Sequence, residues 1–256
     1  MIRFINQTKS DVKKLATLNY QTIAAKSRKI DYSKYIINKP WGYEYLIYEN
    51  GKAAVWILYI KKGHQTSMHA HLTKKTSMTV LSGQIEVRTL EKKLKLNLGE
   101  GILIENGTFH STGAKVQNVV LMEIESPVNK HDLVRLYDSY GRENFGYEGK
   151  KFYEYINFDM YESFKNGASY NNLKKFGEKY LKIVGCSHTL HLAKGSSGMS
   201  VELACLLWGN MRNKSGDQNW TGGDLVDSLY LKDDLNIDSW VELLLVGKID
   251  DRKRII

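Results

Sequence analysis

The hydrophobic pattern of the chain changes near Trp41. From there to about residue 124, apolar residues come in short runs that often alternate with polar residues and are separated by glycines. A period of two is typical of β-strands, and many short strands with glycine turns indicate an all-β barrel or sandwich. The runs are YEYLIYE, AAVWILYI, SMTVLSG, QIEVRTL, KLKLNL, GILIE and VVLMEIE.

The segment before these strands has a helical pattern. Apolar residues recur at roughly helical spacing over residues 9–28, which predicts an amphipathic helix packed on the barrel or on a partner subunit. We expect Ser10 or Asp11 to cap its start. Residues 29–40 are predicted to form a linker that ends at Pro40.

The pattern changes again after Arg142. Residues 158–180 are predicted to be largely helical, with breaks near Gly167 and Asn171. His188 and His191 follow, three residues apart, so on one strand they would face opposite ways and are not expected to bind a metal together. Four strand-like runs complete the chain, namely KYLKIVGCSHTLHLA, MSVELACLLWGN, GGDLVDSLYL and SWVELLLVGKI.

The composition is that of a soluble globular protein. The 256 residues are 42% hydrophobic and 25% charged, and no apolar run is long enough to span a bilayer. The first residues lack an apolar signal core and a cleavage site, so we expect a cytoplasmic protein without a membrane partner. Two cysteines make no disulfide framework, and Cys186 and Cys205 are predicted to be buried thiols.

The net charge of +9 raises the question of nucleic-acid binding. We expect none, because the lysines are spread along the whole chain and no basic block alternates with aromatic residues. A diffuse positive field favours an anionic small molecule instead, such as a sugar phosphate or nucleotide sugar. Lys61 and Lys62 precede the histidine-rich segment, and only one of them can share a face with a site there.

Three of the chain's seven histidines are candidate metal ligands. His69 and His71 form a His-x-His pair, and alternate residues of a strand point to the same face, so both imidazoles can reach one point. His110 closes the later segment GEGILIENGTFH. Two imidazoles from one strand and a third from a neighbour make a plausible first set of ligands for a divalent transition metal.

The histidines stand in a frame that resembles the cupin family, whose members fold as a double-stranded β-helix, a small jelly-roll barrel. The first cupin motif has two histidines followed by a glutamate and a glycine. The second runs from a glycine through a Pro-x-Gly turn to a histidine. The chain fits the first motif at Gly63, His69, His71 and Gly83, and the second at Gly101, Gly107 and His110.

Two positions depart from this frame. Thr76 stands where the family usually has its metal-binding glutamate, and Glu105 stands where it has the turn proline. The first change removes an anionic ligand and a candidate acid or base. The remaining set of His69, His71 and His110 is compatible with Zn, Fe, Mn, Co or Ni, and the ligands alone do not choose among them.

A narrower resemblance covers residues 39–143, which are similar to the cupin domain of type II phosphomannose isomerases, often fused to mannose-1-phosphate guanylyltransferases. Lys39-Pro40-Trp41-Gly42 corresponds to an Arg-Pro-Trp-Gly opening, and Ser67 and Ser82-Gly83 fit as well. The run from Asp132 to Arg142 resembles the closing motif Asp-Ile-Val-Arg and Asp-x-Tyr-Gly-Arg. That family has Gln, His, Glu and His at positions 69, 71, 76 and 110, so the chain keeps two of the four.

The expected fold is therefore mainly β: a cupin jelly-roll barrel with an N-terminal helix and a C-terminal α+β extension. We expect an N-terminal helix and linker over 1–38, the barrel over 39–148, and a helix plus β-rich region over 149–256. The Gly222-Gly223-Asp224 segment resembles a turn common in cupin barrels. The last region is thus either a degenerate second cupin half or a smaller β-rich appendage that extends the first sheet.

Without a glutamate at position 76, another group has to move protons. Glu123 and Glu125 share one face of the last barrel strand. If that face lines the barrel, one of them can replace the lost ligand; if it faces water, both are surface acids, and a structural salt bridge is the third possibility. Tyr140, His64 and a metal-bound water are further candidates for the proton carrier.

Arg135 lies in the closing motif, whose arginine is associated with the active site in the family. The resemblance implies that it holds a phosphate or polarises a hydroxyl or carbonyl group, for which a planar, permanently charged fork is suited. A structural ion pair with Asp132 or Asp138 is the alternative. The predicted substrate contacts are Arg135, Ser67 and Lys61, and the predicted catalytic residues are Arg135, Glu123 and Tyr140.

Three functions fit these observations. The first is a metal-dependent isomerase or epimerase that acts on an anionic sugar, in bacterial surface polysaccharide biosynthesis. The second is a three-histidine non-haem iron oxygenase, which Thr76 favours. The third is a non-catalytic sugar-binding cupin. The resemblance also implies a homodimer, because cupin barrels pair through exposed strands.

Overall fold

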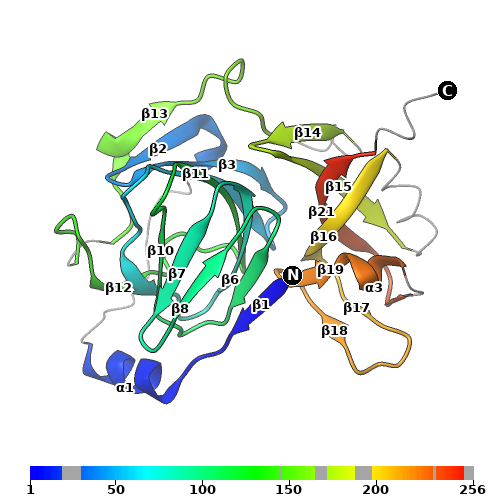
Figure 1. The fold of residues 1–256 in the computed structure, drawn as a ribbon, viewed down its shortest axis with the longest axis horizontal. Coiled ribbons are helices and arrows are strands. Elements are labelled where there is room, and N and C mark those ends of the chain that lie inside the picture. The colour runs from blue at the N-terminus through cyan, green and yellow to red at the C-terminus, as the bar shows by residue number, and fades with distance from the viewer. Residues whose placement is uncertain (19–29, 144–145, 165–171, 188–197, 233–234, 251–256) are drawn as a thin grey trace.

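In the computed structural model, two facing β-sheets are built by residues 2–155, as the alternating pattern predicts (Figure 1). The structure describes the whole chain except residues 19–29, 144–145, 165–171, 188–197, 233–234 and 251–256. Among the described residues, no helix is long and apolar enough to cross a lipid bilayer.

The larger of the two sheets, called the long sheet, has eight strands. Neighbouring strands are antiparallel except β1 and β9, which run parallel. The order is β1 (Ile2–Ile5), β9 (Gly101–Ile104), β6 (Lys75–Ser82), β11 (Val119–Ser126), β4 (Ala54–Ile60), β3 (Gly42–Glu49), β2 (Tyr35–Lys39) and β13 (Tyr153–Tyr155).

The facing sheet, called the short sheet, has five antiparallel strands. Apolar residues of both sheets meet between them, among them Trp56, Leu121 and Val87. The described strands do not close into one continuous barrel, so the fold is an open cupin-like jelly roll. The order in the short sheet is β12 (Val134–Tyr137), β5 (Met68–Ala70), β10 (His110–Gly113), β7 (Ile85–Thr89) and β8 (Lys93–Leu96).

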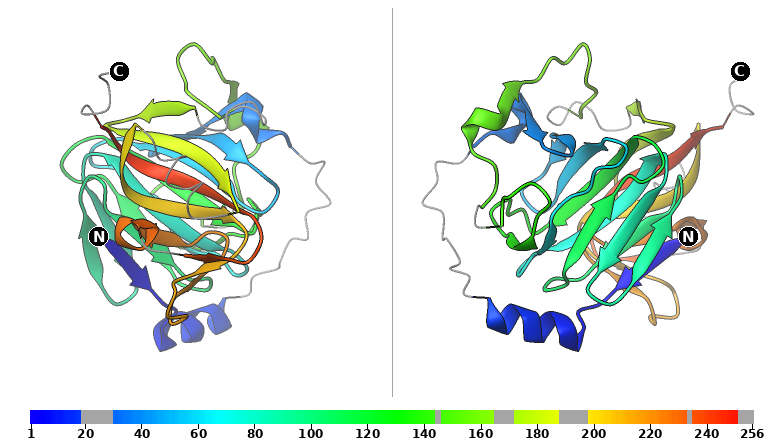
Figure 2. Two further views of the ribbon diagram at one scale, coloured as in Figure 1. Left: turned by 90° about the vertical axis from the view of Figure 1, so that its right-hand side faces the viewer. Right: turned by 60° about the vertical axis from the view of Figure 1, so that its left-hand side comes forward.

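A third sheet, called the C-terminal sheet, packs on the outer face of the long sheet (Figure 2). Ile57, Met122 and Leu81 of the long sheet belong to the same apolar cluster as Leu181 and Ile183 of the C-terminal sheet. The long sheet is thus covered on both faces, which explains why its central strands β4 and β6 are buried at most positions. The order is β14 (Leu173–Phe176), β15 (Lys179–Cys186), β21 (Val241–Ile249), β16 (Met199–Trp208) and β19 (Leu225–Asp227).

The far side of the C-terminal sheet has its own apolar cluster, to which Met211, Trp220 and Leu235 contribute. A small three-stranded sheet and one short helix supply these and neighbouring residues. Both cysteines are buried in the C-terminal sheet, as expected. The elements are β18 (Asn219–Trp220), β17 (Met211–Arg212), β20 (Asn236–Ile237) and α3 (Ser228–Lys232).

The N-terminal helix packs on the barrel. The described part is α1 (Lys9–Thr17), and its Leu15 contacts Met68 and Phe109 on the outside of the short sheet. The predicted caps are wrong, because Thr8 is the N-cap and Asp11 completes a capping box with it. The predicted extension of the helix beyond residue 18 lies outside the described residues.

Several segments outside the predicted barrel join its long sheet. Residues 35–39 were expected to be linker but form β2, and β1 and β13 lie at the two edges of the sheet. Short 3-10 turns, η1 (Tyr32–Lys34) and η2 (Lys150–Phe152), precede β2 and β13. The reason is that both edges of the long sheet offer unpaired backbone groups, which these strands satisfy.

The C-terminal predictions are right in part. Of the four expected runs, the first, second and fourth form β15, β16 and β21, and the third forms the short β19 and α3. The helix over 158–180 is wrong where it can be checked: residues 158–161 make turns, and Leu173–Phe176 pair with β15. Within the described part of the chain, β14 to β21 form separate sheets, whereas β13 at the start of the predicted region extends the long sheet by pairing with β2. His188 and His191 lie outside the described residues.

Candidate metal centre

Strand β5 places two histidines on the inner side of the short sheet. Its Met68 and Ala70 face outwards to α1, so the alternate residues His69 and His71 face inwards. His110, at the start of β10, is the direct cross-strand partner of His69. The centroids of the three rings are 4.5 to 5.5 Å apart. The structure therefore brings together the three predicted ligands.

Each of the three imidazoles is oriented by a backbone carbonyl. The Nδ1 atom of His69 lies 2.8 Å from the carbonyl oxygen of Ser67, and that of His110 lies 3.0 Å from the carbonyl oxygen of Thr108. The Nδ1 atom of His71 contacts the carbonyl oxygen of Asp132. A carbonyl only accepts, so each Nδ1 carries the proton and each Nε2 keeps its lone pair. This arrangement fixes the tautomer that a metal ligand requires.

The three histidines are neutral at ordinary pH. Burial, together with the neighbouring His110, lowers the pKa of His69 well below its ordinary value. Burial and the ammonium group of Lys74 do the same for the pKa of His71. Burial lowers the pKa of His110 to about 4. A metal therefore does not have to displace protons from these ligands near neutral pH.

The donor set fits a divalent transition metal. One ligand atom from each histidine lies within 4.8 Å of the other two. Thr76, at the position of the family's glutamate, is buried in β6, and its hydroxyl has no hydrogen-bond partner among the described residues. The group thus offers three neutral nitrogen donors, which suit Zn, Fe, Co or Ni, and no carboxylate at position 76.

The two glutamates of β11 both face the interior, with Val119 and Leu121 of the same strand, so the solvent-facing alternative is wrong. Glu125 forms ion pairs with Lys74 at 2.8 Å and Lys130 at 3.1 Å. Glu123 lines the cavity beside the histidines and has no hydrogen bond or ion pair with any described residue. Burial raises the pKa of Glu123 to about 7.

Glu125 begins a chain of buried ion pairs along the interior. Lys130 also contacts Glu44 at 3.1 Å, and Glu44 contacts Lys39 at 3.3 Å. Lys39 then pairs with Glu148, which also binds Arg135 and Arg142. Each charge has an opposite neighbour, which offsets the cost of removing it from water. The members, in order, are Lys74, Glu125, Lys130, Glu44, Lys39, Glu148, Arg135 and Arg142.

Arg135 lies next to the histidines, because it is the cross-strand partner of His69 on the other edge of β5. Its Nε atom donates to the hydroxyl of Ser67 at 3.3 Å, and its Nη2 atom lies 3.3 Å from Glu148. The ion-pair partners predicted for Arg135 from the sequence were Asp132 and Asp138. Asp132 instead accepts bonds from backbone N–H groups of residues 72–74, and Asp138 pairs with Arg142.

The structure does not place two predicted site residues at the cavity. Lys61 is exposed, and Tyr140 has its hydroxyl 3.3 Å from the backbone N–H of Gln65, which donates to it. His64 stacks on the ring of Tyr140. None of the three lines the cavity, whereas Ser67, Arg135 and Glu123 do.

Sequence reasoning missed most of the basic and acidic residues of the cavity. Lys74, Lys130 and Glu148 lie outside the recognised motifs, although Lys39 stands in the Lys-Pro-Trp-Gly segment and Arg142 in the closing motif. The one feature of the sequence that could have indicated these residues was the presence of charged side chains within the alternating runs. Glu44 occupies an inward position of the YEYLIYE run, for which the sequence was equally compatible with a solvent-facing position.

The cavity that joins these residues is small, with a volume of about 60 Å³. This is room for a few water molecules, whereas sites for small organic ligands typically reach about 300 Å³ or more. A metal and the reacting end of a ligand fit the present volume. A sugar-sized ligand would require this cavity to widen.

Residues 26–138 match the family model described as "Mannose-6-phosphate isomerase C-terminal". The resemblance to this cupin domain is thus confirmed over the segment that holds β2 to β12 and all three histidines. The match starts before the segment recognised in the sequence and ends at Asp138, ahead of the last part of the closing motif. The comparison with curated proteins gave no match.

Solved structures similar to part of the chain include proteins described as cupins. KdgF from Halomonas sp. has a TM-score of 0.36 and 17% identity, and the match covers 40% of this chain and 96% of that one. A cupin-2 domain containing protein from Shewanella frigidimarina has a TM-score of 0.31 and 21% identity, and the match covers 35% of this chain and 83% of that one. A structure described as "Putative sugar phosphate isomerase", from Acidithiobacillus ferrooxidans, has a TM-score of 0.28 and 18% identity. That match covers 30% of this chain and 51% of the other. At these TM-scores the likenesses say nothing about function.

Proposed function

We propose that the cavity is the active site of a metal-dependent isomerase or epimerase that acts on a sugar phosphate or nucleotide sugar, in surface polysaccharide biosynthesis. The observation that carries the proposal is the convergence of three neutral imidazoles beside an unpaired glutamate, Glu123. Aldose–ketose isomerisation and epimerisation both need a polarised carbonyl and a group that moves a proton.

His69, His71 and His110 would hold the metal through their Nε2 atoms. A metal bound there supplies polarisation of a carbonyl group and orientation of adjacent hydroxyl groups. The backbone carbonyls at Nδ1 hold the rings in place while the ligand exchanges. The buried positions of His71 and His110 limit the access of bulk water to the reacting end of the substrate.

Glu123 is the residue best placed to carry the proton. It lines the same cavity as His69 and His71 and has no ion-pair partner among the described residues that would fix it as a carboxylate. A pKa of about 7 lets it accept and return a proton near neutral pH with little energetic cost. Glu125 is unsuited to this role, because two lysines hold it ionised.

The charges of the cavity suit an anionic substrate. Five basic side chains line it, against four acidic ones, and Glu123 carries no full charge near pH 7. A bound divalent metal adds further positive charge. Arg135 and Arg142 add permanent positive charge to the cavity lining, with Ser67 as a neighbouring hydroxyl. The fork of Arg135 is held by Glu148, and that of Arg142 by Glu148 and Asp138.

A three-histidine non-haem iron oxygenase is the second candidate. Two observations favour it: position 76 carries no carboxylate, and a volume of about 60 Å³ suits a smaller substrate than a sugar. The arrangement of Glu123 favours the isomerase, because oxygen chemistry at iron does not require an unpaired acid of this pKa.

The test is elemental analysis of untagged protein purified without chelator, beside a His69→Ala, His71→Ala double variant. His131→Ala, an exposed histidine outside the group, is the matched control. We expect about one metal per chain in the wild type and the control, and none in the double variant. Loading with Zn, Co or Ni followed by conversion of sugar phosphates or nucleotide sugars would support the isomerase.

Other outcomes decide between the alternatives. Iron with oxygen uptake would favour the oxygenase. A sugar that binds in a His71-dependent way without any turnover would favour a non-catalytic sugar-binding cupin. No metal in any sample, even after loading, would overturn the metalloenzyme. A homodimer and a cytoplasmic location stay predictions from the sequence.

A further inference from the structure

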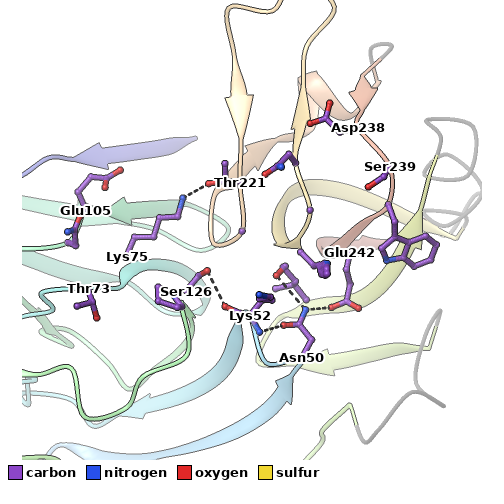
Figure 3. Close-up of a pocket in the computed structure, with 18 residues that line it drawn as sticks. Asn50, Lys52, Thr73, Lys75, Glu105, Ser126, Thr221, Asp238, Ser239 and Glu242 are labelled. Atoms are coloured by element: carbon purple, nitrogen blue, oxygen red, sulfur yellow. Dashed lines mark hydrogen bonds between the residues drawn. The ribbon is translucent and has the colours of Figure 1, made fainter. Parts of the chain in front are cut away.

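A second and much larger cavity lies between the jelly roll and the C-terminal part of the chain. Its volume is about 1060 Å³. Figure 3 shows Thr73, Lys75 and Glu105 on one side and Asp238 and Ser239 on the other. We call this cavity the interdomain groove. It shares no lining residue with the histidine cavity.

The long sheet separates the two cavities. Lys74 and Glu125 point into the histidine cavity, whereas their chain neighbours Lys75 and Ser126 line the interdomain groove. Adjacent residues of a strand point to opposite faces, so two ligands can occupy the two cavities at once. The groove is thus a candidate site of its own.

Two tryptophans that line the groove are partly exposed. Trp208 is 39% exposed and Trp240 is 48% exposed. Exposed apolar side chains that gather in one groove indicate a binding site. Trp208 ends β16, and Trp240 directly precedes β21. Aromatic rings with one free face are typical platforms for ligands that have an apolar face and a polar rim.

The Trp240 ring is held rigidly. It lies so close over Gly185 that a Cβ atom there would come within 2.1 Å of the indole. Gly209, next to Trp208, has a φ of +88°, and a Cβ at this glycine would lie 2.3 Å from the carbonyl oxygen of Trp240. Both glycines therefore permit contacts that fix the two tryptophan segments, which reduces the entropy lost on binding.

Polar groups surround the tryptophans. Asn210, Asp238 and Ser239 line the groove, and their side chains make no hydrogen bond with any described residue. Deeper in the groove, the Asn50 amide donates to Glu242 at 2.7 Å (Figure 3). Amide, hydroxyl and carboxylate groups together can donate to and accept from hydroxyl groups of a ligand.

The charges of the groove disfavour an anion. Lys52 and Lys75 are the basic residues that line it, against Glu105, Asp238 and Glu242. Lys75 is already held by Asp224 at 2.6 Å and by the hydroxyl of Thr221 at 2.9 Å. The groove therefore lacks the excess of basic side chains that the histidine cavity has.

We propose that the interdomain groove binds a neutral saccharide of one or two sugar units. A sugar ring presents an apolar face to an indole and hydroxyl groups to amide, hydroxyl and carboxylate partners. The volume lies slightly above the range of about 300 to 1,000 Å³ that is typical of small-molecule sites, so one or two sugar units fit. A sugar in the groove thus accounts for the exposed tryptophans of the C-terminal half, for which the jelly roll gives no reason.

Saturation-transfer-difference NMR on the full chain tests the proposal. The probes are methyl α-mannoside, methyl β-galactoside, methyl N-acetyl-β-glucosaminide and maltose, beside mannose 6-phosphate. We expect at least one neutral probe to bind the wild type and the His69→Ala, His71→Ala double variant equally. Trp208→Ala and Asp238→Asn should weaken that binding about threefold to tenfold.

Tyr155→Ala is the matched control, because Tyr155 is 80% exposed but lies outside the groove. The Tyr155→Ala variant should bind the neutral probe as tightly as the wild type does. Trp240→Phe serves as a second variant that keeps a ring over Gly185, and it should also weaken binding.

Three results would overturn the proposal. The first is no binding of any neutral probe at millimolar concentration. The second is binding that the histidine variant abolishes and the tryptophan variants leave intact, which would assign the sugar to the histidine cavity. The third is that mannose 6-phosphate is the single probe whose affinity for the protein falls in the Trp208→Ala variant. Because the histidine variant is included, failure of this proposal is distinguishable from failure of the metal site.

Discussion

Glu123 and Glu125 are two residues apart on β11 and face the same interior, yet among the described residues only Glu125 has ion-pair partners. Burial raises the pKa of Glu123 to about 7. Burial alone would also raise the pKa of Glu125, but the ammonium groups of Lys130 and Lys74 hold it below its ordinary value. Two like carboxyls are thus set apart by their neighbours, which is how one site obtains distinct acid–base and structural groups.

The raised pKa of Glu123 predicts a pH-dependent loss of stability. An unfolded glutamate titrates near 4.3, so between about pH 5 and pH 7 the folded protein binds more protons than the unfolded chain. Stability is then fully present below the unfolded pKa and falls as pH rises through about 7. Glu123→Gln removes this loss, so from about pH 5 to about pH 8 the variant should gain about 2.5 kcal/mol relative to the wild type.

Urea denaturation at the two pH values measures the difference. Glu154→Gln, an exposed position on β13, should show no such change. A constant offset between Glu123→Gln and the wild type at both pH values would show that Glu123 is ionised throughout. If the proposed isomerase is right, Glu123→Gln should also lower turnover by about 10² to 10⁴.

The ion-pair chain predicts unequal effects at its first two members. Glu125→Gln leaves the ammonium groups of Lys74 and Lys130 facing each other without their shared carboxylate, and should cost about 3 to 5 kcal/mol. Lys74→Met should cost less, because Glu125 keeps Lys130. Urea denaturation at neutral pH gives both values.

The exposed pair of Lys34 and Asp31 is the control for this series. Lys34→Met should change the free energy of unfolding by about 0 to 1 kcal/mol. Equal costs for Glu125→Gln and Lys74→Met would mean that Lys130 does not compensate for the loss of Lys74.

The three-histidine group could be predicted from sequence because its geometry is local. His69 and His71 converge through the two-residue period of one strand, and His110 follows from a motif with fixed order. Gly42 of the Lys-Pro-Trp-Gly segment is required by its backbone conformation and by a cross-strand contact with β4. Its φ is +149°, and a Cβ atom there would lie 1.9 Å from the carbonyl oxygen of Tyr59.

The ion-pair chain could not be predicted, because its partners are distant in sequence. Lys39 meets Glu148, and Lys130 meets Glu44, only after the sheets have assembled. A charged residue in an alternating strand is equally compatible with a solvent-facing position. Likewise, the pattern alone did not show that β1 and β13 complete the long sheet, because strand partners at an edge depend on tertiary packing.

Thr76→Glu should restore an anionic ligand. Thr76 is buried on the strand face that also carries Met78 and Val80 of the interior core, and its hydroxyl has no partner among the described residues. A carboxylate there would add an oxygen donor to three imidazoles, so we expect metal affinity to rise by about tenfold or more. Competition with a chelator at fixed pH measures the change.

Thr76→Gln is the matched control, because it adds the same volume without the charge. It should leave metal affinity unchanged or lower it. Equal affinities of the Glu and Gln variants would show that position 76 does not reach the metal in this chain.

Asp11 links the N-terminal helix to the histidine group. Its side chain accepts bonds from the backbone N–H and hydroxyl of Thr8, both at 2.8 Å, and from the backbone N–H of Phe109 at 3.0 Å. Phe109 directly precedes His110, so Asp11 fixes the backbone that carries the third ligand.

Asp11→Ala should therefore cost about 2 to 4 kcal/mol, since it removes half of a capping box and leaves the buried N–H of Phe109 without its partner. Lys13→Ala, exposed on the same helix, should change the free energy of unfolding by less than about 0.5 kcal/mol. Urea denaturation measures the stability, and chelator competition measures the metal affinity. A stability loss without any loss of metal affinity would mean that the strand pairing of His110 with His69 positions the ligand without help from α1.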